Sequence, residues 1–177
     1  MKHGQGKRGM AFENLVNMAN TQYKNKGLAL ISKRPTPVKV LQSKGVHILK
    51  AVWGTKSSVD YSGVYNGQAI EFEAKSVAGK RFDLKNIHDH QIQYLKNAEQ
   101  HGAAAFLLIK FRDTREVFFT PLSLITLAAK NADQGGRKSI PIDDFQIYAD
   151  QVERAEGYHW TFWPSWTNIL RKFQLIK

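Results

Sequence analysis

The stretch from residue 59 to residue 75 reads VDYSGVYNGQAIEFEAK, and two of its three carboxylates, with its one amine, lie at a spacing that could support chemistry. The Asn-Gly pair at 66–67 predicts a two-residue hairpin turn, because such a turn needs positive φ angles. In the strand after the turn, Glu73 and Lys75 would project from one face, since side chains alternate along a strand. The turn would bring Asp60 back toward them at an edge of the sheet. Two carboxylates beside an ammonium can bind a divalent metal ion and stabilise a charged transition state.

The same residues have a simpler interpretation as an ordinary surface strand with alternating charges. On that view Ile70, Phe72 and Ala74 face the core, while Glu71 and the charged residues after it on the same face are only solvated. An aspartate followed at a distance by Glu-x-Lys arises often by chance. The motif alone therefore leaves both interpretations open.

The composition is that of one globular domain with a sizeable core. The chain has 177 residues, of which 42% are hydrophobic and 11% aromatic, as in ordinary globular proteins. Cysteine is absent, which excludes disulfides, zinc–thiolate sites and cysteine nucleophiles. No apolar run is long enough to span a membrane, and the composition is compatible with a cytoplasmic protein.

The charge distribution predicts a polyanionic partner. The formal net charge is +11 and the pI is about 9.8. Between Met1 and Lys56 the sole acidic residue is Glu13, whereas the rest of the chain is nearly balanced. This asymmetry favours contact with nucleic acid. An anionic membrane surface fits less well, because the basic segment lacks an amphipathic helix with lysines around a bulky apolar face.

Apolar residues at helical spacing predict a helix over 10–26, and Gly27 is placed to end it. Glu13 would lie in the first turn of this helix. There it either complements the helix dipole or adds a carboxylate to the metal site, and the sequence favours neither.

A basic projection is predicted to follow the first helix. A short strand over 28–32 precedes Lys33 and Arg34, and the prolines after this pair would hold it outward. Two strand-like runs then flank Ser43-Lys44-Gly45, which predicts a hairpin over 38–56 that contains Trp53 and no acidic residue. Such a ribbon is a plausible nucleic-acid element.

The remaining elements follow from periodicity and turn residues. We expect a basic loop over 76–86 and then a helix to about Gln100, with Asp89 as its N-cap. Strands over 103–111 and 116–120 would follow, then a helix to about Ala129 and a polar loop to Ser139. The aromatic tail over 158–177 is expected to pack in the core or in a dimer interface.

Five blocks of the sequence, in order, resemble the RecU family of Holliday-junction resolvases. The blocks are RGMAFE (8–13), GLALISKRPTPVKV (27–40), DYSGVYNG (60–67), FEAK (72–75) and HDHQIQ (88–93). The resemblance implies an α/β, restriction-endonuclease-like PD-(D/E)XK fold, in which a central mixed sheet is flanked by helices and carries an inserted basic stalk. It also implies a homodimer that cuts four-way DNA junctions with Mg²⁺ or Mn²⁺ and works beside recombination proteins.

Carried over by motif, Asp60, Glu73 and Gln91 would form the metal shell, and Lys75 would stabilise the transition state. Family members usually have threonine at the position of Ser58, which is also assigned to the metal shell; serine keeps the hydroxyl but loses the β-branch. The family's stalk corresponds to 38–56 and is shorter here than in typical cellular members, which would suit a phage-encoded protein.

Contacts with DNA are expected from basic residues outside the motif. These are Lys33, Arg34, Lys39, Lys44, Lys50, Lys80 and Arg81. Two other functions compete with junction resolution: a different PD-(D/E)XK nuclease, or a non-catalytic DNA-binding protein that assists recombination. The intact acidic motif argues against the second of these.

Overall fold

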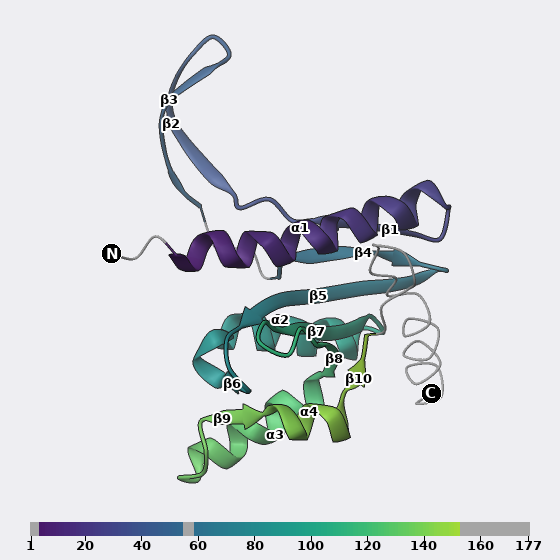
Figure 1. Cartoon of the computed structure of the whole chain (residues 1–177). Coiled ribbons are helices and arrows are strands. Elements are labelled where there is room, and N and C mark those ends of the chain that lie inside the picture. Colours follow the sequence, from purple (N-terminus) through teal and green to yellow (C-terminus); the bar gives the residue numbers. More distant parts are fainter. Residues whose placement is uncertain (1–3, 55–58, 153–177) are drawn as a thin grey trace.

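The computed structural model describes residues 4–54 and 59–152, and these residues form a mixed α/β fold around a central sheet (Figure 1). The sheet has six strands in the order β1-β4-β5-β7-β8-β10. Their bounds are β1 (Ala29–Lys33), β4 (Tyr61–Tyr65), β5 (Gln68–Val77), β7 (Ala104–Phe111), β8 (Val117–Pro121) and β10 (Asp150–Gln151). Neighbouring strands are antiparallel except β5 and β7, which are parallel. A mixed sheet flanked by helices, as predicted, is confirmed.

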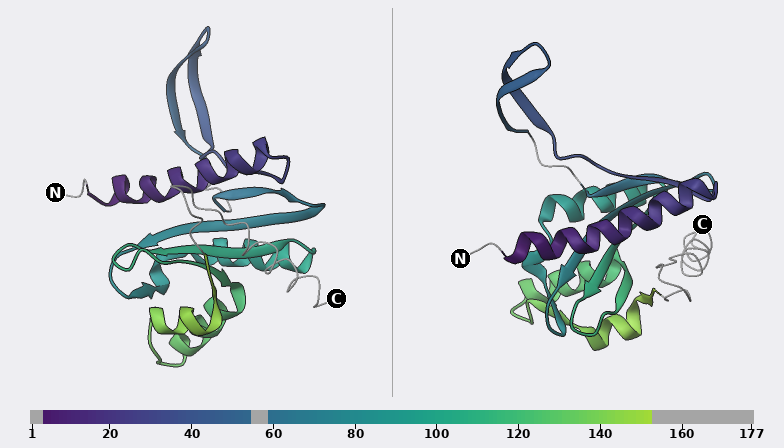
Figure 2. Two further views of the ribbon diagram at one scale, coloured as in Figure 1. Left: turned by 45° about the vertical axis from the view of Figure 1, so that its right-hand side comes forward. Right: turned by 45° about the horizontal axis from the view of Figure 1, so that its top comes forward.

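Helices cover both faces of the sheet (Figure 2). In the described part of the chain they are α1 (Gly4–Asn25), α2 (Asp89–Gln100), α3 (Leu122–Asp133) and α4 (Ile142–Tyr148). On one face Phe72 and Phe106 pack with Phe12 of α1, and on the other Leu107 packs with Leu95 of α2. Each fully buried side chain of this size contributes roughly 1.5–3 kcal/mol. None of these helices is long and apolar enough to cross a membrane.

The Asn-Gly hairpin is formed as predicted and joins β4 to β5. Asn66 has a φ of 46° and Gly67 a φ of 78°, the positive angles of a primed two-residue turn. The alternation predicted for β5 is also confirmed for its apolar face, because Ile70, Phe72 and Ala74 are buried in the cluster beneath α1.

A two-stranded ribbon projects from the body of the protein (Figure 1). It consists of β2 (Val38–Lys44) and β3 (His47–Trp53), and every residue from 38 to 53 is exposed. We call residues 38–53 the ribbon. Its two ends are close together, because the backbone N–H of Gly54 donates to the carbonyl oxygen of Pro37 at 2.9 Å. The hairpin predicted around residues 43–45 is therefore present, with its turn slightly later, after Lys44.

The segment predicted as a loop over 76–86 contains structure of its own. Strand β6 (Arg81–Asp83) pairs with β9 (Ser139–Pro141), and a 3₁₀ turn, η1 (Leu84–Asn86), follows β6. Such short strands carry too few residues to show alternation in the sequence. The predicted aromatic tail lies outside the described residues.

Candidate active site

The two predicted carboxylates meet at the centre of the sheet. The expected edge position is wrong, because β5 lies between β4 and β7. The register sets Tyr61 opposite Phe72, so one step further along the strands Asp60 comes level with Glu73. The backbone N–H of Asp60 donates to Oε2 of Glu73 at 3.0 Å, and the backbone N–H of Ala74 donates to Oδ2 of Asp60 at 3.4 Å. Backbone donors therefore hold both carboxylates on one face.

Lys75 neutralises the other oxygen of Glu73. Its Nζ lies 2.7 Å from Oε1 of Glu73, and the glutamate side chain is 1% exposed while the lysine is 22% exposed. A buried carboxylate is costly unless it is paired and hydrogen-bonded, and Glu73 is both. A solvated surface strand therefore does not describe this face of β5.

The environment of Asp60 favours its protonated form. Burial is the largest cause, the negative charge of Glu73 is the second, and together they raise the pKa of Asp60 from 3.8 to about 7 against the opposing charge of Lys75. At neutral pH the carboxyl group is thus partly protonated, and a cation bound between the two carboxylates would displace that proton.

Gln91 lies in the first turn of α2, and its side chain is buried. Its Oε1 accepts the backbone N–H of His88 at 3.1 Å, as part of the cap of α2. His88 is the N-cap residue, so the prediction of Asp89 as the cap is wrong by one position. An amide oxygen has a second lone pair, which leaves a ligand role for Gln91 chemically possible. Ser58 lies outside the described residues.

Glu13 lies beyond the first turn of α1, because the helix begins at Gly4. The helix-dipole interpretation is therefore wrong. The Glu13 carboxylate pairs with Lys33. The backbone carbonyl oxygen of Glu13 accepts a hydrogen bond from the Tyr61 hydroxyl at 3.3 Å. In residues 4–54 and 59–152 no group of three His, Cys, Asp or Glu side chains gathers as a metal site. A role for Glu13 in binding metal stays a prediction.

Arg34 does not extend outward as the prolines after it suggested. Its Nη2 donates to both carboxylate oxygens of Glu71 at 3.1 Å and to the Tyr94 hydroxyl at 2.8 Å, and the guanidinium lies 5.2 Å from the centroid of the Tyr94 ring. Neither Glu71 nor Tyr94 was expected at the site from the sequence. The sequence contains only a weak indication of these two residues, because Glu71 shares the strand face of Glu73 and Tyr94 follows Gln91 by one helical turn.

The other basic residues predicted to contact DNA fall in two places. Lys39, Lys44 and Lys50 are exposed on the ribbon, while Lys80 and Arg81 are exposed beside β6. The ribbon also exposes large apolar side chains on both strands. These include Leu41 at 50% on β2, and Trp53 at 77% and Ile48 at 57% on β3, while Val46 in the turn is 94% exposed. The structure leaves all five basic side chains accessible to a polyanion.

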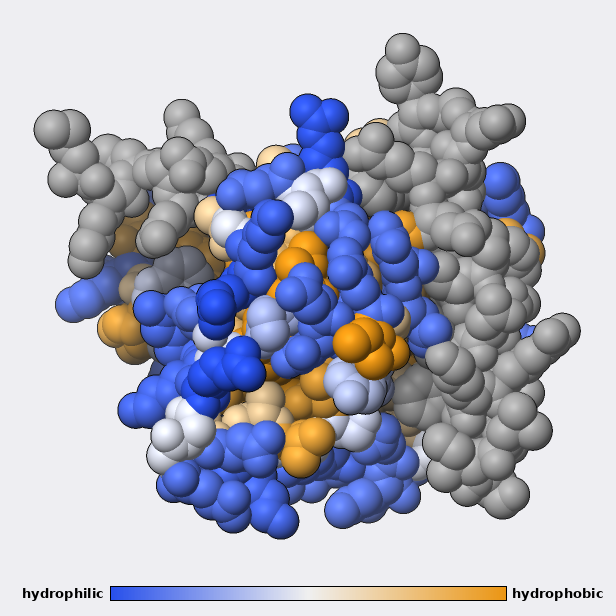
Figure 3. Space-filling view, turned by 60° about the horizontal axis from the view of Figure 1, so that its bottom comes forward, coloured by the Kyte–Doolittle hydropathy of each residue, from blue (hydrophilic) through white to orange (hydrophobic). Residues whose placement is uncertain are grey.

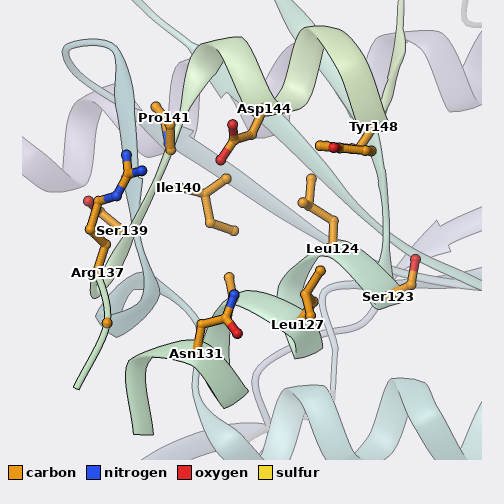
Figure 4. Close-up of a pocket in the computed structure, with 12 residues that line it drawn as sticks. Ser123, Leu124, Leu127, Asn131, Arg137, Ser139, Ile140, Pro141, Asp144 and Tyr148 are labelled. Atoms are coloured by element: carbon orange, nitrogen blue, oxygen red, sulfur yellow. The ribbon is translucent and has the colours of Figure 1, made fainter. Parts of the chain in front are cut away.

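A pocket of about 580 Å³ lies elsewhere, between α3, β9 and α4 (Figure 4). Leu124 and Ile140 project into it, and Arg137 and Asp144 lie at its rim. Figure 3 shows apolar side chains exposed among hydrophilic ones on this lower side of the molecule. None of the predicted site residues within the described ranges lines the pocket, so it is separate from the carboxylate pair.

Comparison with known proteins gives a consistent result over most of the chain. The family described as "Recombination protein U" matches residues 7–164. Proteins named Holliday junction resolvase RecU from Staphylococcus aureus strains JH9 and COL are 39% identical over 161 residues, which cover 87% of this chain and 73% of each relative. The protein of the same name from strain MRSA252 is 38% identical over the same length.

Proposed function

Because the chain belongs to the Recombination protein U family, we propose that it is an endonuclease that resolves four-way DNA junctions with the help of a divalent metal ion. The observation that carries this proposal is the cluster that Asp60, just before β4, forms with Glu73 and Lys75 of the adjacent strand β5. The relatives named Holliday junction resolvase RecU align with 87% of this chain.

We further propose that the fold is of the PD-(D/E)XK type and forms a single nuclease domain from which the ribbon extends. Support comes from the mixed sheet, in which β4, preceded by the aspartate, pairs with β5, which carries the Glu-x-Lys. α1 and α2 cover opposite faces of that sheet.

The side chains present fit Mg²⁺. This ion is bound through one or two carboxylates and keeps several waters, and the structure holds two carboxylates together through backbone N–H groups and Lys75. Asp60 and Glu73 would hold the ion, Gln91 and Ser58 would complete the shell, and Glu13 is a further candidate. Mn²⁺ has the same preference for oxygen ligands. Bound there, the ion would activate water and neutralise charge that develops on the phosphate.

Lys75 would act on the phosphate itself. Its ammonium is held beside Glu73 and is still partly exposed, so it can approach an oxygen of the substrate. A positive charge placed where negative charge develops lowers the barrier without reorganisation of the site.

Recognition of DNA would come from the basic surfaces. Lys39, Lys44 and Lys50 carry charge on a ribbon narrow enough to enter the open centre of a junction, and Lys80 and Arg81 would contact a duplex arm. Lys33 is the last residue of β1, before the ribbon, and pairs with Glu13. Since one active site cuts one strand, a two-fold junction calls for a homodimer, and recombination proteins would be its partners.

The experiment compares Mg²⁺-dependent cleavage of three DNA substrates by the purified protein: a mobile four-way junction, a linear duplex and a flap. Selective cleavage of the junction is expected. Equal cleavage of all three would indicate a different nuclease of the same superfamily, and binding without cleavage would indicate an accessory protein.

A further inference from the structure

The contacts of Arg34 join the three elements that carry the predicted metal ligands. Arg34 follows β1, and its backbone N–H donates to the carbonyl oxygen of Asp60 at 2.7 Å. Its guanidinium binds Glu71, which lies two residues before Glu73 on the same face of β5. One residue thus touches the backbone that presents the aspartate and the strand that presents the glutamate.

The third connection is to α2. Tyr94 accepts a hydrogen bond from Arg34 at 2.8 Å and also contacts the guanidinium with its ring. Tyr94 follows Gln91 by three residues, so the two side chains lie on the same side of the helix. A guanidinium has a rigid fork of donors and a flat face for stacking, and Arg34 uses both to hold α2 against β5.

The burial of the Arg34–Glu71 ion pair favours a role for Arg34 in positioning the site over a contact with DNA. The Glu71 side chain is 14% exposed and the Arg34 side chain 32%. To contact a phosphate, Arg34 would have to leave a mostly buried carboxylate without its partner, which is strongly unfavourable. While the pair is intact, Glu71 adds no net charge beside Glu73, and the negative charge for a cation rests on Asp60 and Glu73.

We propose that Arg34 is a positioning residue of the cleavage site and not a ligand of DNA. With Glu71 and Tyr94 it fixes Asp60 against Glu73 and seats the helix that carries Gln91. This inference rests on the proposed function in one respect, namely that Asp60 and Glu73 hold the metal ion. It assigns Arg34 a different role from the DNA contact predicted for the basic pair in the sequence.

The test measures Mn²⁺ binding by calorimetry without DNA, together with the saturating cleavage rate and the junction Kd. Arg34→Ala is expected to weaken Mn²⁺ binding and to lower the saturating rate, each by about 10- to 100-fold, the usual effect of losing a partner that orients metal ligands. The junction Kd stays at the parent value. Arg34→Lys gives smaller losses of the same kind, because lysine keeps the charge but lacks the fork and the flat face.

Further variants keep the test decisive if Arg34→Ala does not fold. Tyr94→Phe removes only the hydroxyl that accepts from Arg34. Glu71→Gln removes the charge and replaces one of the two oxygens that accept from Arg34 with a donor. Each variant is expected to bind Mn²⁺ more weakly than the parent. Asp60→Asn identifies the calorimetric signal that belongs to this site. Lys130→Ala removes an exposed positive charge at the end of α3 and is the control for charge alone.

Two results would overturn the inference. One is a weaker junction Kd for Arg34→Ala, with a salt dependence reduced by about one charge, while Mn²⁺ binding and the saturating rate stay at parent values. The other is a lower Tm with Mn²⁺ binding unchanged, which would make the residue merely structural. If the parent protein binds Mn²⁺ but cuts no junction, the proposed function fails, while the Mn²⁺ measurements still decide the role of Arg34.

Discussion

Asp60, just before β4, lies level with Glu73 of the neighbouring strand β5, and backbone N–H groups and Lys75 hold their carboxylates there. Removing either charge should remove the metal ion and leave the phosphate contacts of the basic surfaces intact. Asp60→Asn and Glu73→Gln are therefore each expected to lower junction cleavage by more than about a hundredfold, with the junction Kd unchanged. Parallel cleavage and gel-shift assays check this, and rates within about tenfold of the parent for both variants would refute the assignment.

The raised pKa of Asp60 makes the stability of the metal-free protein depend on pH. The folded state holds this proton up to about pH 7 and the unfolded state only to 3.8, so stability falls as pH rises through that window. Asp60→Asn lacks this dependence and should melt at a higher temperature than the parent at about pH 8. The Tm of both proteins, measured without metal at about pH 5 and pH 8, checks the direction of this change in stability. If the Tm of Asp60→Asn falls between these pH values as much as that of the parent, another group causes the pH dependence.

The sequence predicted that Asp60, Glu73 and Lys75 come together, but not what surrounds them. Alternation along β5 and the Asn-Gly turn were enough to bring Asp60, Glu73 and Lys75 together. The contacts of Arg34 were not predictable, because they need the packing of three elements that are far apart in the chain. Proline after Arg34 restricts its backbone but says nothing about which way the side chain turns.

At the level of elements, β1 approaches β4 so closely that only glycine fits. A Cβ at Gly63 would lie 2.2 Å from the carbonyl oxygen of Leu30 and 2.6 Å from Cα of Ile31. Both are backbone atoms, so Gly63→Ala is expected to destabilise the protein by about 1–3 kcal/mol in urea denaturation. Gly9→Ala is the control, because Gly9 lies within α1 with nothing near its Cβ position, and alanine should stabilise the helix by about 0.5–1 kcal/mol. Equal stability of the Gly63→Ala variant and the parent would show that β1 can move away.

The ribbon is expected to select junctions over duplex DNA. Its ends are joined by the bond between Gly54 and Pro37, so a short Gly-Ser turn can replace residues 38–53 without opening the sheet. The shortened protein should retain its Tm and weak duplex binding but lose its preference for junctions, because under the proposed function the basic ribbon enters the open centre. A competition assay between junction and duplex at fixed ionic strength measures this. Undiminished preference would reduce the ribbon to a structural hairpin.

Elements with a clear period or a strong turn were predictable, and elements defined by a distant partner were not. The β4–β5 hairpin and the ribbon follow from local residues. β6 and β9 pair across more than fifty residues of chain, with three residues each. The central position of β5 also escaped prediction, since its second neighbour, β7, is reached only after α2.

On the scale of the whole molecule, the proposed single domain carries both the basic ribbon and the carboxylate pair, so binding at a junction centre and cutting near it would be coupled. A two-fold dimer would then place two such sites on strands of the same polarity. The paired sites of a dimer are what distinguish resolution of a junction from nicking of any DNA.

The most direct measurement labels each strand of a mobile four-way junction in turn and maps the incisions made by the protein with Mg²⁺. The proposed function predicts cuts at symmetric positions in two opposing strands, none in an equal amount of linear duplex, and none with Asp60→Asn. Incisions distributed over all four strands and the duplex alike, or a bound junction that remains uncut, would contradict it.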